Sequence, residues 1–306
     1  MGSEALQANG VMNGGLRWRI FTFALMGAAL LALSFRPLSE LMVWAWGDQL
    51  HSYIPLIPPV SGYLIIRERE HIFREVETGT VPGLVFLALG GAVFGLTAAA
   101  GEAVPEVDRL SGMAVALVLG LTGCFGAVFG TRALRRASFS FCFLLLMAPI
   151  PSLVLEWILG ALQRGSAEVT HVLFMATGVP FLRDGFTFQL PGMTIEVAPQ
   201  CGGIRSSISL MIVSLLVCRF FLHTTSRRVM LVLSVIPITL FKNGVRIVTL
   251  SLLGVYVDPR ILGSELHRSG GIPFFAVALA LLLAMAWGLR KTEKLQRIQE
   301  LHHEEL

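Results

Sequence analysis

Charged residues are scarce in this chain: Asp, Glu, Lys and Arg make up only 14% of its 306 residues. Soluble domains carry about 25%, so the composition argues against a soluble globular protein. Apolar residues make up 54% of the chain, and the mean hydropathy is +0.72. Several apolar runs reach the roughly 20 residues that cross a bilayer. The composition therefore predicts an integral membrane protein.

Cysteine is also scarce, with four residues in the chain. Cys124, Cys142 and Cys218 lie inside apolar runs, where a small thiol usually serves packing, so no disulfide framework is expected. The formal charge of +4 does not indicate nucleic-acid binding, because the basic residues are spread between the apolar runs. Cys201 differs from the other three, since it stands between glutamine and glycine at a polar boundary.

The apolar runs predict an all-α membrane fold with about eight transmembrane helices. The first run, Phe21–Phe35, follows Arg17 and Arg19 and precedes further spans, so it is interpreted as a signal anchor. Six more spans are expected at 81–100, 110–130, 139–160, 204–222, 229–256 and 272–289. The eighth, between 41 and 66, is interrupted by polar residues and prolines, so its membranous part is expected at Ile54–Ile66.

Lysine and arginine positions predict the orientation, because these residues are enriched in cytoplasmic loops. With a cytoplasmic N-terminus, 15 of the 24 fall on the inner side: Arg17, Arg19, Arg67, Arg69, Arg74, Arg132, Arg135, Arg136, Arg219, Arg227, Arg228, Arg290, Lys291, Lys294 and Arg297. Six fall on the outer side: Arg36, Arg109, Arg164, Arg183, Arg260 and Arg268. The chain is therefore predicted to be a multi-pass protein of the inner (cytoplasmic) membrane. Both of its termini are predicted to be cytoplasmic.

Three regions follow along the chain. Residues 1–15 are predicted to be a disordered tail, 16–290 a single polytopic domain, and 291–306 a charged cytoplasmic tail. The longest outer connection, 161–203, begins with a predicted interfacial helix. It continues with two alternating runs around Pro191-Gly192, which predict a small non-cytoplasmic β-hairpin over 186–197.

Cys201 is the first candidate for chemistry. It directly precedes a predicted helix, whose N-terminus favours a thiolate over a thiol. Arg205 adds a cation four residues later, and Gly202 and Gly203 allow a substrate backbone to approach the sulfur. The alternative is an inert loop cysteine.

Arg246 is the second candidate, about ten residues or roughly 15 Å inside the outer end of its span. A charge at that depth is expected to face a cavity or a partner, and Asn243 lies one turn earlier on the same face. The alternative is an ion pair with Glu156 or Glu196 that joins helices.

His267, on the outer side before the last span, is the third candidate, because histidine transfers protons near neutral pH. His51 and His171 map to the same side, and spacing does not choose among the three. Cys201, Arg246 and His267 together supply a nucleophile, an oxyanion donor and an acid/base in the outer half of the membrane. This set predicts a cysteine protease or transpeptidase, and none of its motifs calls for a cofactor or metal.

The chain resembles the exosortase/archaeosortase family of membrane transpeptidase-like enzymes over about residues 17–290. The resemblance is carried by Leu146-Met-Ala-Pro-Ile-Pro151, Val197-Ala-Pro-Gln-Cys-Gly-Gly-Ile-Arg-Ser206, Ile236-Pro237, Lys242-Asn-Gly-Val-Arg246 and His267-Arg-Ser-Gly-Gly271. It implies that Cys201 is the nucleophile, Arg246 a catalytic arginine and His267 the acid/base. Where family members commonly have Cys-Ser-Gly, this chain has Cys201-Gly202-Gly203, so a hydroxyl at position 202 is not used here.

The resemblance also implies the substrate: a secreted protein whose C-terminal tail carries a Pro-Glu-Pro motif, a transmembrane stretch and a basic end. Cleavage near the motif, with possible transfer to an acceptor, would pass through a thioester with Cys201. Partners are then such secreted proteins and the lipid bilayer, not nucleic acid, and the sequence does not indicate an oligomeric state. Two other functions stay open, a transporter or channel and a structural subunit of a polysaccharide or secretion assembly.

Overall fold

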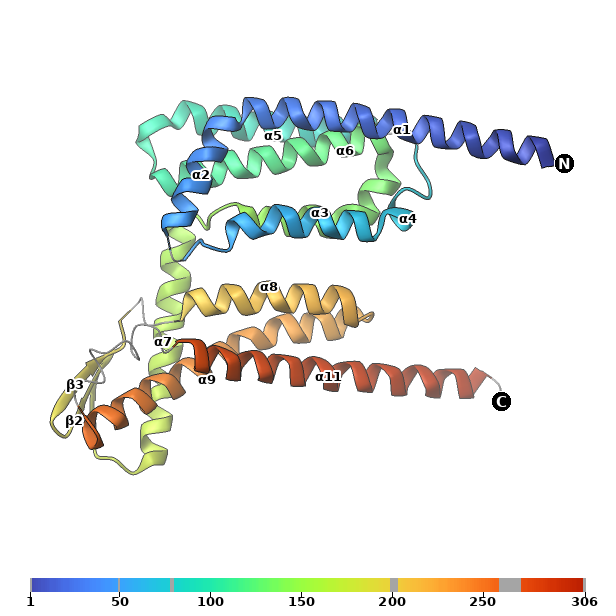
Figure 1. Ribbon diagram of the computed structural model, residues 1–306. Coiled ribbons are helices and arrows are strands. Elements are labelled where there is room, and N and C mark those ends of the chain that lie inside the picture. Colours follow the sequence, from blue (N-terminus) through green and yellow to red (C-terminus); the bar gives the residue numbers. More distant parts are fainter. Residues whose placement is uncertain (1, 49, 78–79, 199–202, 259–270, 305–306) are drawn as a thin grey trace. The chain divides into compact units, whose positions relative to one another are not determined.

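The computed structural model describes residues 2–48, 50–77, 80–198, 203–258 and 271–304 (Figure 1). The part of the chain that the structure describes is 83% helical with one small three-stranded sheet, which confirms the predicted all-α membrane class. It divides into two compact units, Met1–Val154 and Leu155–Leu306, and each is described by itself. The prediction of one polytopic domain flanked by two tails stays a prediction.

The first unit consists of helices connected by short turns. In chain order they are α1 (Gly2–Leu33), α2 (Phe35–Gly47), the 3₁₀ turn η1 (Ile54–Leu56), α3 (Ile57–Arg67), α4 (Arg69–Ile72), α5 (Thr80–Ala100), η2 (Gly101–Ala103), α6 (Glu106–Leu144) and η3 (Leu145–Met147). α1 begins at Gly2, inside the segment for which composition predicts disorder. In the 41–66 region, Pro55 and Pro58 occupy first-turn positions of η1 and α3, where a missing N–H is tolerated.

α6 is two helical segments that run in opposite directions. Gly130 interrupts it with φ 87° and ψ 175°. The rings of Phe125 and Phe141 lie 5.1 Å apart, although 16 residues of straight helix would separate them by about 24 Å. The chain therefore reverses at Gly130, as Figure 1 shows for the green segment. Only glycine adopts this backbone conformation readily.

The predicted span 139–160 is wrong in its boundaries. The second segment of α6 ends at Leu144, η3 follows, and α7 (Ser152–Thr177) begins a new helix. Pro149 and Pro151 explain the break, because proline lacks an N–H and disfavours a helical residue before it. The Asp108 carboxylate accepts hydrogen bonds from the Ser152 amide and hydroxyl at 2.6 and 2.7 Å, which satisfies donors at the start of α7.

Six helices are long and apolar enough to cross a membrane, counted over the described residues. One of them, Glu106–Met147, contains the reversal at Gly130, and the shorter Ile54–Arg67 is also apolar. If both segments of α6 and this shorter helix are counted, the total reaches the eight that the sequence predicts. The chain is a multi-pass membrane protein by either count.

Segments predicted on the same side of the membrane contact one another within the first unit. On the predicted inner side, Arg19 donates to the Glu77 carbonyl at 3.3 Å, and Arg136 donates to the His71 carbonyl at 3.1 Å. On the predicted outer side, Arg109 pairs with Glu40 at 3.3 Å. These contacts support the alternation of the spans. Which side is cytoplasmic stays a prediction.

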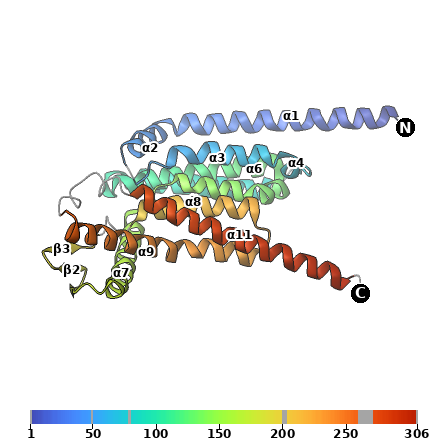
Figure 2. The same ribbon diagram turned by 60° about the horizontal axis from the view of Figure 1, so that its bottom comes forward.

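The second unit combines three membrane helices with α7 and a sheet. α8 (Ile204–Phe221), α9 (Thr225–Tyr256) and α11 (Gly271–Glu304) pack against each other, and α7 crosses them (Figures 1 and 2). At the predicted inner end, the Glu293 carboxylate of α11 accepts hydrogen bonds from the backbone amides of His223 and Thr224, just before α9. The segment predicted as an interfacial helix, Ala161–Gly178, lies in α7 except for Gly178, and its interfacial position stays a prediction.

The predicted hairpin is confirmed. β2 (Thr187–Leu190) and β3 (Met193–Glu196) pair antiparallel across Pro191-Gly192, and β1 (Leu182–Asp184), which the sequence analysis did not predict, joins the other edge of β2. Arg183 holds the sheet to α7 through two contacts with the Glu168 carboxylate, at 2.6 and 3.2 Å. Hydrogen bonding to Arg183 lowers the pKa of Glu168.

Candidate functional site

The candidate site is built where α7 crosses α9. Glycines allow the two helices to approach closely: a Cβ on Gly244 of α9 would lie 2.6 Å from Val169, and one on Gly165 of α7 would lie 2.8 Å from Leu240. Small residues serve the same purpose at helix crossings in membranes. The crossing fixes the part of α9 that carries the predicted site residues.

Asn243 is completely buried at this crossing. Its amide Nδ2 donates to Ser166 Oγ of α7 at 2.9 Å. Its Oδ1 has no hydrogen-bond partner among the described residues, although it is also buried. An unpaired buried acceptor costs free energy, so Oδ1 is available to an N–H group that approaches it.

Lys242 extends from α9 to the start of α8. Its side chain is 4% exposed, and Nζ donates to Ser206 Oγ at 2.5 Å. Ser206 Oγ donates in turn to the Gly203 carbonyl at 2.8 Å. A chain of hydrogen bonds therefore links the buried ammonium to the residue that precedes α8.

Gly203 is required for two reasons at this point. It has φ +74° at the N-cap of α8, a left-handed conformation that favours glycine. A Cβ here would also lie 3.0 Å from Lys242 Nζ and 3.4 Å from Asn243 Oδ1. The donor of Lys242 and the acceptor of Asn243 thus face the same backbone position.

The sheet fixes the chain on the other side of the segment 199–202. Val197 is 1% exposed in an apolar cluster with Phe174, Phe188 and Val248. Its N–H donates to the Phe186 carbonyl at 2.9 Å, and its carbonyl accepts from Gln163 Nε2 of α7 at 2.7 Å. The chain thus leaves a fixed strand before residue 199 and is fixed again at Gly203.

Arg246 and Arg205 lie on α9 and α8 respectively. Arg246 is partly buried and follows Lys242 and Asn243 by one helical turn. Arg205 is exposed in the first turn of α8. The structure therefore brings Asn243 to Gly203 and keeps Arg246 on the adjacent turn of the same helix.

Cys201, Gly202 and His267 lie outside the described residues. The two other histidines predicted on the outer side are described, and both have packing partners. His51 is 2% exposed, contacts Asp48 Oδ2 through Nδ1 at 2.7 Å and lies against Trp44. The His171 ring packs edge-on against Phe181 at 5.3 Å between centroids.

Sequence analysis missed Lys242, Ser206 and Ser166 as members of this cluster. The rule that singled out Arg246 applies equally to Lys242, because a cation inside an apolar span needs a partner or a cavity. Lys242 and Arg246 are also four residues apart, which places them on one face of α9. The two serines carry no comparable signal, since serine is common in membrane helices.

The cluster places the Lys242 cation, the Asn243 amide and the Ser206 hydroxyl beside Gly203. Such groups are suited to bind a polar backbone group and to stabilise negative charge. Within the described residues, no three His, Cys, Asp or Glu side chains gather as metal ligands would. The sequence-based expectation that the chain needs no metal or cofactor stays a prediction.

Comparison with known proteins identifies one family. A family model described as transmembrane exosortase matches residues 44–284, which is most of the chain and covers the larger part of each unit. No curated protein and no solved structure matches.

Proposed function

Because the chain belongs to the transmembrane exosortase family, whose members are membrane cysteine peptidases and transpeptidases, we propose that it cleaves the C-terminal sorting tail of secreted proteins with Cys201 as nucleophile. The observation that carries this proposal is the cluster of Lys242, Asn243 and Ser206 around Gly203, two residues after Cys201. A buried cation and an unpaired buried acceptor at this point are costly to the fold, which supports a role in function.

The proposed reaction has two steps. The Cys201 thiolate attacks the carbonyl carbon of the scissile peptide bond, and Arg246 stabilises the negative charge on the carbonyl oxygen. The C–N bond then breaks, the leaving amine takes a proton from His267, and a thioester remains on Cys201. Water or an acceptor nucleophile attacks the thioester, gives its proton to His267 and releases Cys201 as the thiolate.

Lys242 adds a positive charge near Gly203, which favours a thiolate nearby. Arg205 and the N-terminus of α8 act in the same sense. Asn243 Oδ1 is suited to accept an N–H of the bound tail, while Gly202 and Gly203 leave room for its backbone.

The substrate proposed is a secreted protein with a Pro-Glu-Pro-like motif, a transmembrane stretch and a basic end. The sheet offers an edge to which an extended tail can add as a strand. Within the described residues the edge strands are β1 and β3, whereas β2 is paired on both sides. We assign the tail to β3, because the chain runs from this strand to Cys201.

The proposed location is the inner membrane, with both termini cytoplasmic and the site towards the periplasmic face. A tail anchored by its own transmembrane stretch would then arrive with its motif at the level of the site. The two alternatives predict different behaviour: a transporter or channel would retain activity in Cys201→Ser, and a structural subunit would be unaffected by Cys201→Ala.

The test is co-expression of the full chain with a tagged secreted substrate. We expect tail removal to be lost in Cys201→Ala and Arg246→Ala, with normal membrane insertion. Cys142→Ala is the matched control, because Cys142 is an exposed cysteine of the first unit. Unchanged tail removal in Cys201→Ala would refute the proposal.

A further inference from the structure

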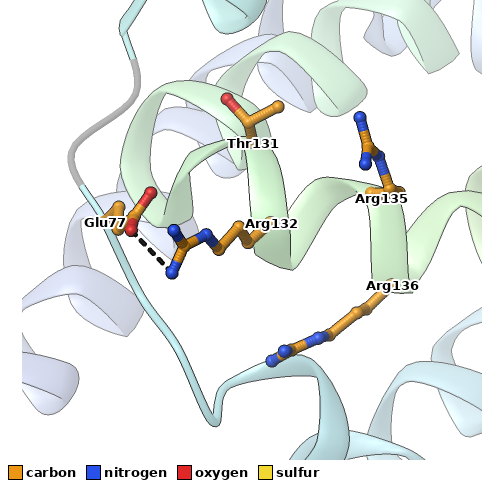
Figure 3. Close-up of a pocket in the computed structure, with 5 residues that line it drawn as sticks. All are labelled: Glu77, Thr131, Arg132, Arg135 and Arg136. Atoms are coloured by element: carbon orange, nitrogen blue, oxygen red, sulfur yellow. Dashed lines mark ion pairs between the residues drawn. The ribbon is translucent and has the colours of Figure 1, made fainter.

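A cavity of about 500 Å³ lies beside the reversal of α6, remote in sequence from Cys201. It is lined by Glu77, Thr131, Arg132, Arg135 and Arg136 (Figure 3). All of these residues belong to the first unit, and the proposed protease function uses none of them.

Positive charge exceeds negative charge around this cavity. Glu75 pairs with Arg132 and Arg136 at 3.1 Å each, and Glu77 pairs with Arg132 at 2.9 Å. Hydrogen bonding to Arg136 is the main cause of a lowered pKa for Glu75, so this carboxylate stays ionised. Arg135 adds a third arginine to the two that these carboxylates neutralise.

A further cation lies next to this group. Arg19 of α1 donates to the backbone carbonyls of Glu77 and Val128, at 3.3 and 2.7 Å. A backbone carbonyl carries no net charge, so these hydrogen bonds leave the positive charge of Arg19 in place. The group thus has a net charge of +2. It contains four arginines and two glutamates: Arg19, Arg132, Arg135, Arg136, Glu75 and Glu77.

Two donors lining the cavity are unused. Among the described residues, Arg135 and Thr131 make no hydrogen bond or ion pair, and both are exposed. In Figure 3, Arg132 turns towards Glu77, whereas Arg135 extends away from that pair. A guanidinium and a hydroxyl are therefore free to bind an anion.

The cavity lies at the end of the membrane spans. Glu77 shortly precedes the apolar run that starts at Val81, and Thr131 directly follows the turning point of α6. Trp18, adjacent to Arg19, is 70% exposed, and exposed tryptophans gather at the headgroup level of a bilayer. Lipid headgroups would thus meet the cavity.

We propose that this cavity binds the phosphate of an anionic phospholipid headgroup. Arginine matches phosphate oxygens with its fork of donors, and basic pockets at the ends of membrane helices bind such headgroups. Free inorganic phosphate has the same chemistry, but the lipid is present at this depth at far higher local concentration. The proposal does not depend on which side is cytoplasmic.

The test measures lipid binding by the purified full chain in neutral detergent, with fluorescently labelled phosphatidylglycerol and phosphatidylcholine. We expect phosphatidylglycerol to bind more tightly, and Arg135→Gln to weaken its binding about fivefold, since one arginine at the membrane surface contributes about that much. Thr131→Val, which removes only the hydroxyl, should weaken it by a smaller factor.

Arg74→Gln is the matched control, because Arg74 is exposed at the same end but does not line the cavity. Arg132 and Arg136 are left intact, since their loss would break ion pairs and confuse binding with folding. Equal binding of the two lipids, or equal weakening by Arg135→Gln and Arg74→Gln, would overturn the proposal. Displacement of the lipid by millimolar inorganic phosphate would assign the site to free phosphate instead.

Discussion

Lys242 and Asn243 are neighbours in α9, yet their side chains reach different helices. Asn243 binds Ser166 of α7, and Lys242 binds Ser206 of α8. Together they fix α9 against both helices around Gly203. Their different directions depend on tertiary packing, which a sequence pattern does not contain. Sequence analysis identified Asn243 from its spacing to Arg246, and it overlooked Lys242 although the rule for cations inside apolar spans also applies to it.

At the residue scale, Lys242→Met is expected to lower kcat/KM for tail removal about tenfold or more. Methionine keeps most of the volume but removes a positioned cation beside the site, and a single such group commonly contributes that much or more to a rate. Lys291→Met, which removes an exposed lysine from α11, should leave the rate unchanged. Equal rates for Lys242→Met and wild type would contradict the role given to Lys242.

The α7–α9 crossing is the element on which the site depends. Gly244→Ala would place a Cβ 2.6 Å from a Val169 methyl, whereas Gly288→Ala in α11 would meet nothing within 4 Å. Overpacking of this kind costs about 1–3 kcal/mol. We therefore expect a lower Tm in detergent for Gly244→Ala and no decrease for Gly288→Ala. A Tm that is the same in both variants would show that the crossing is not tightly packed.

β3 is an edge strand of the described sheet, and this gives a second prediction for an element. Val197 N–H points to β2, so the alternating N–H of Thr194 points away from it. Thr194→Pro removes that outward donor and should leave the pairing with β2 intact, but it should reduce tail removal if the tail adds to this edge. Thr194→Val keeps the N–H and is the control. Full activity of Thr194→Pro would eliminate strand addition at β3.

Helices and strands were predictable where the sequence pattern that specifies them is local. Alternation around Pro191-Gly192 predicted the hairpin, and apolar length predicted the long membrane helices. The 139–160 span was wrong because hydropathy continues through Pro149 and Pro151, which stop the helix. The reversal at Gly130 shows in contacts between Phe125 and Phe141, and such contacts do not follow from hydropathy. Among the site residues, the structure gives positions for Arg205, Gly203, Asn243 and Arg246, while Cys201, Gly202 and His267 lie outside the described residues.

At the scale of the whole molecule, topology is best supported in the first unit, where the predicted inner segments contact one another and the predicted outer segments do the same. Asp108 with Ser152, and Arg109 with Glu40, mark one end of the first unit, while Arg19 with Glu77 marks the other. This pattern agrees with membrane spans that alternate in direction along the first unit. It leaves the absolute orientation to experiment.

Cysteine labelling tests that orientation. In a background with both Cys142→Ala and Cys201→Ala, which removes the exposed Cys142 thiol, Glu102→Cys should react with a membrane-impermeant maleimide added from the periplasmic side. Arg74→Cys should react only after the inner membrane is permeabilised, because the two exposed residues lie in connections predicted on opposite sides. The reverse labelling pattern would invert the topology and place Cys201 on the cytoplasmic side.

The central claim is that Cys201 forms a thioester with the cleaved substrate. The most direct measurement incubates the purified full chain with a tagged substrate, stops the reaction in acid and identifies the adduct by mass spectrometry. We expect an acyl group on the Cys201 peptide that hydroxylamine removes, present in wild type and Cys142→Ala and absent in Cys201→Ala. Tail removal that continues in Cys201→Ala, with no adduct on Cys201 in wild type, would contradict the claim.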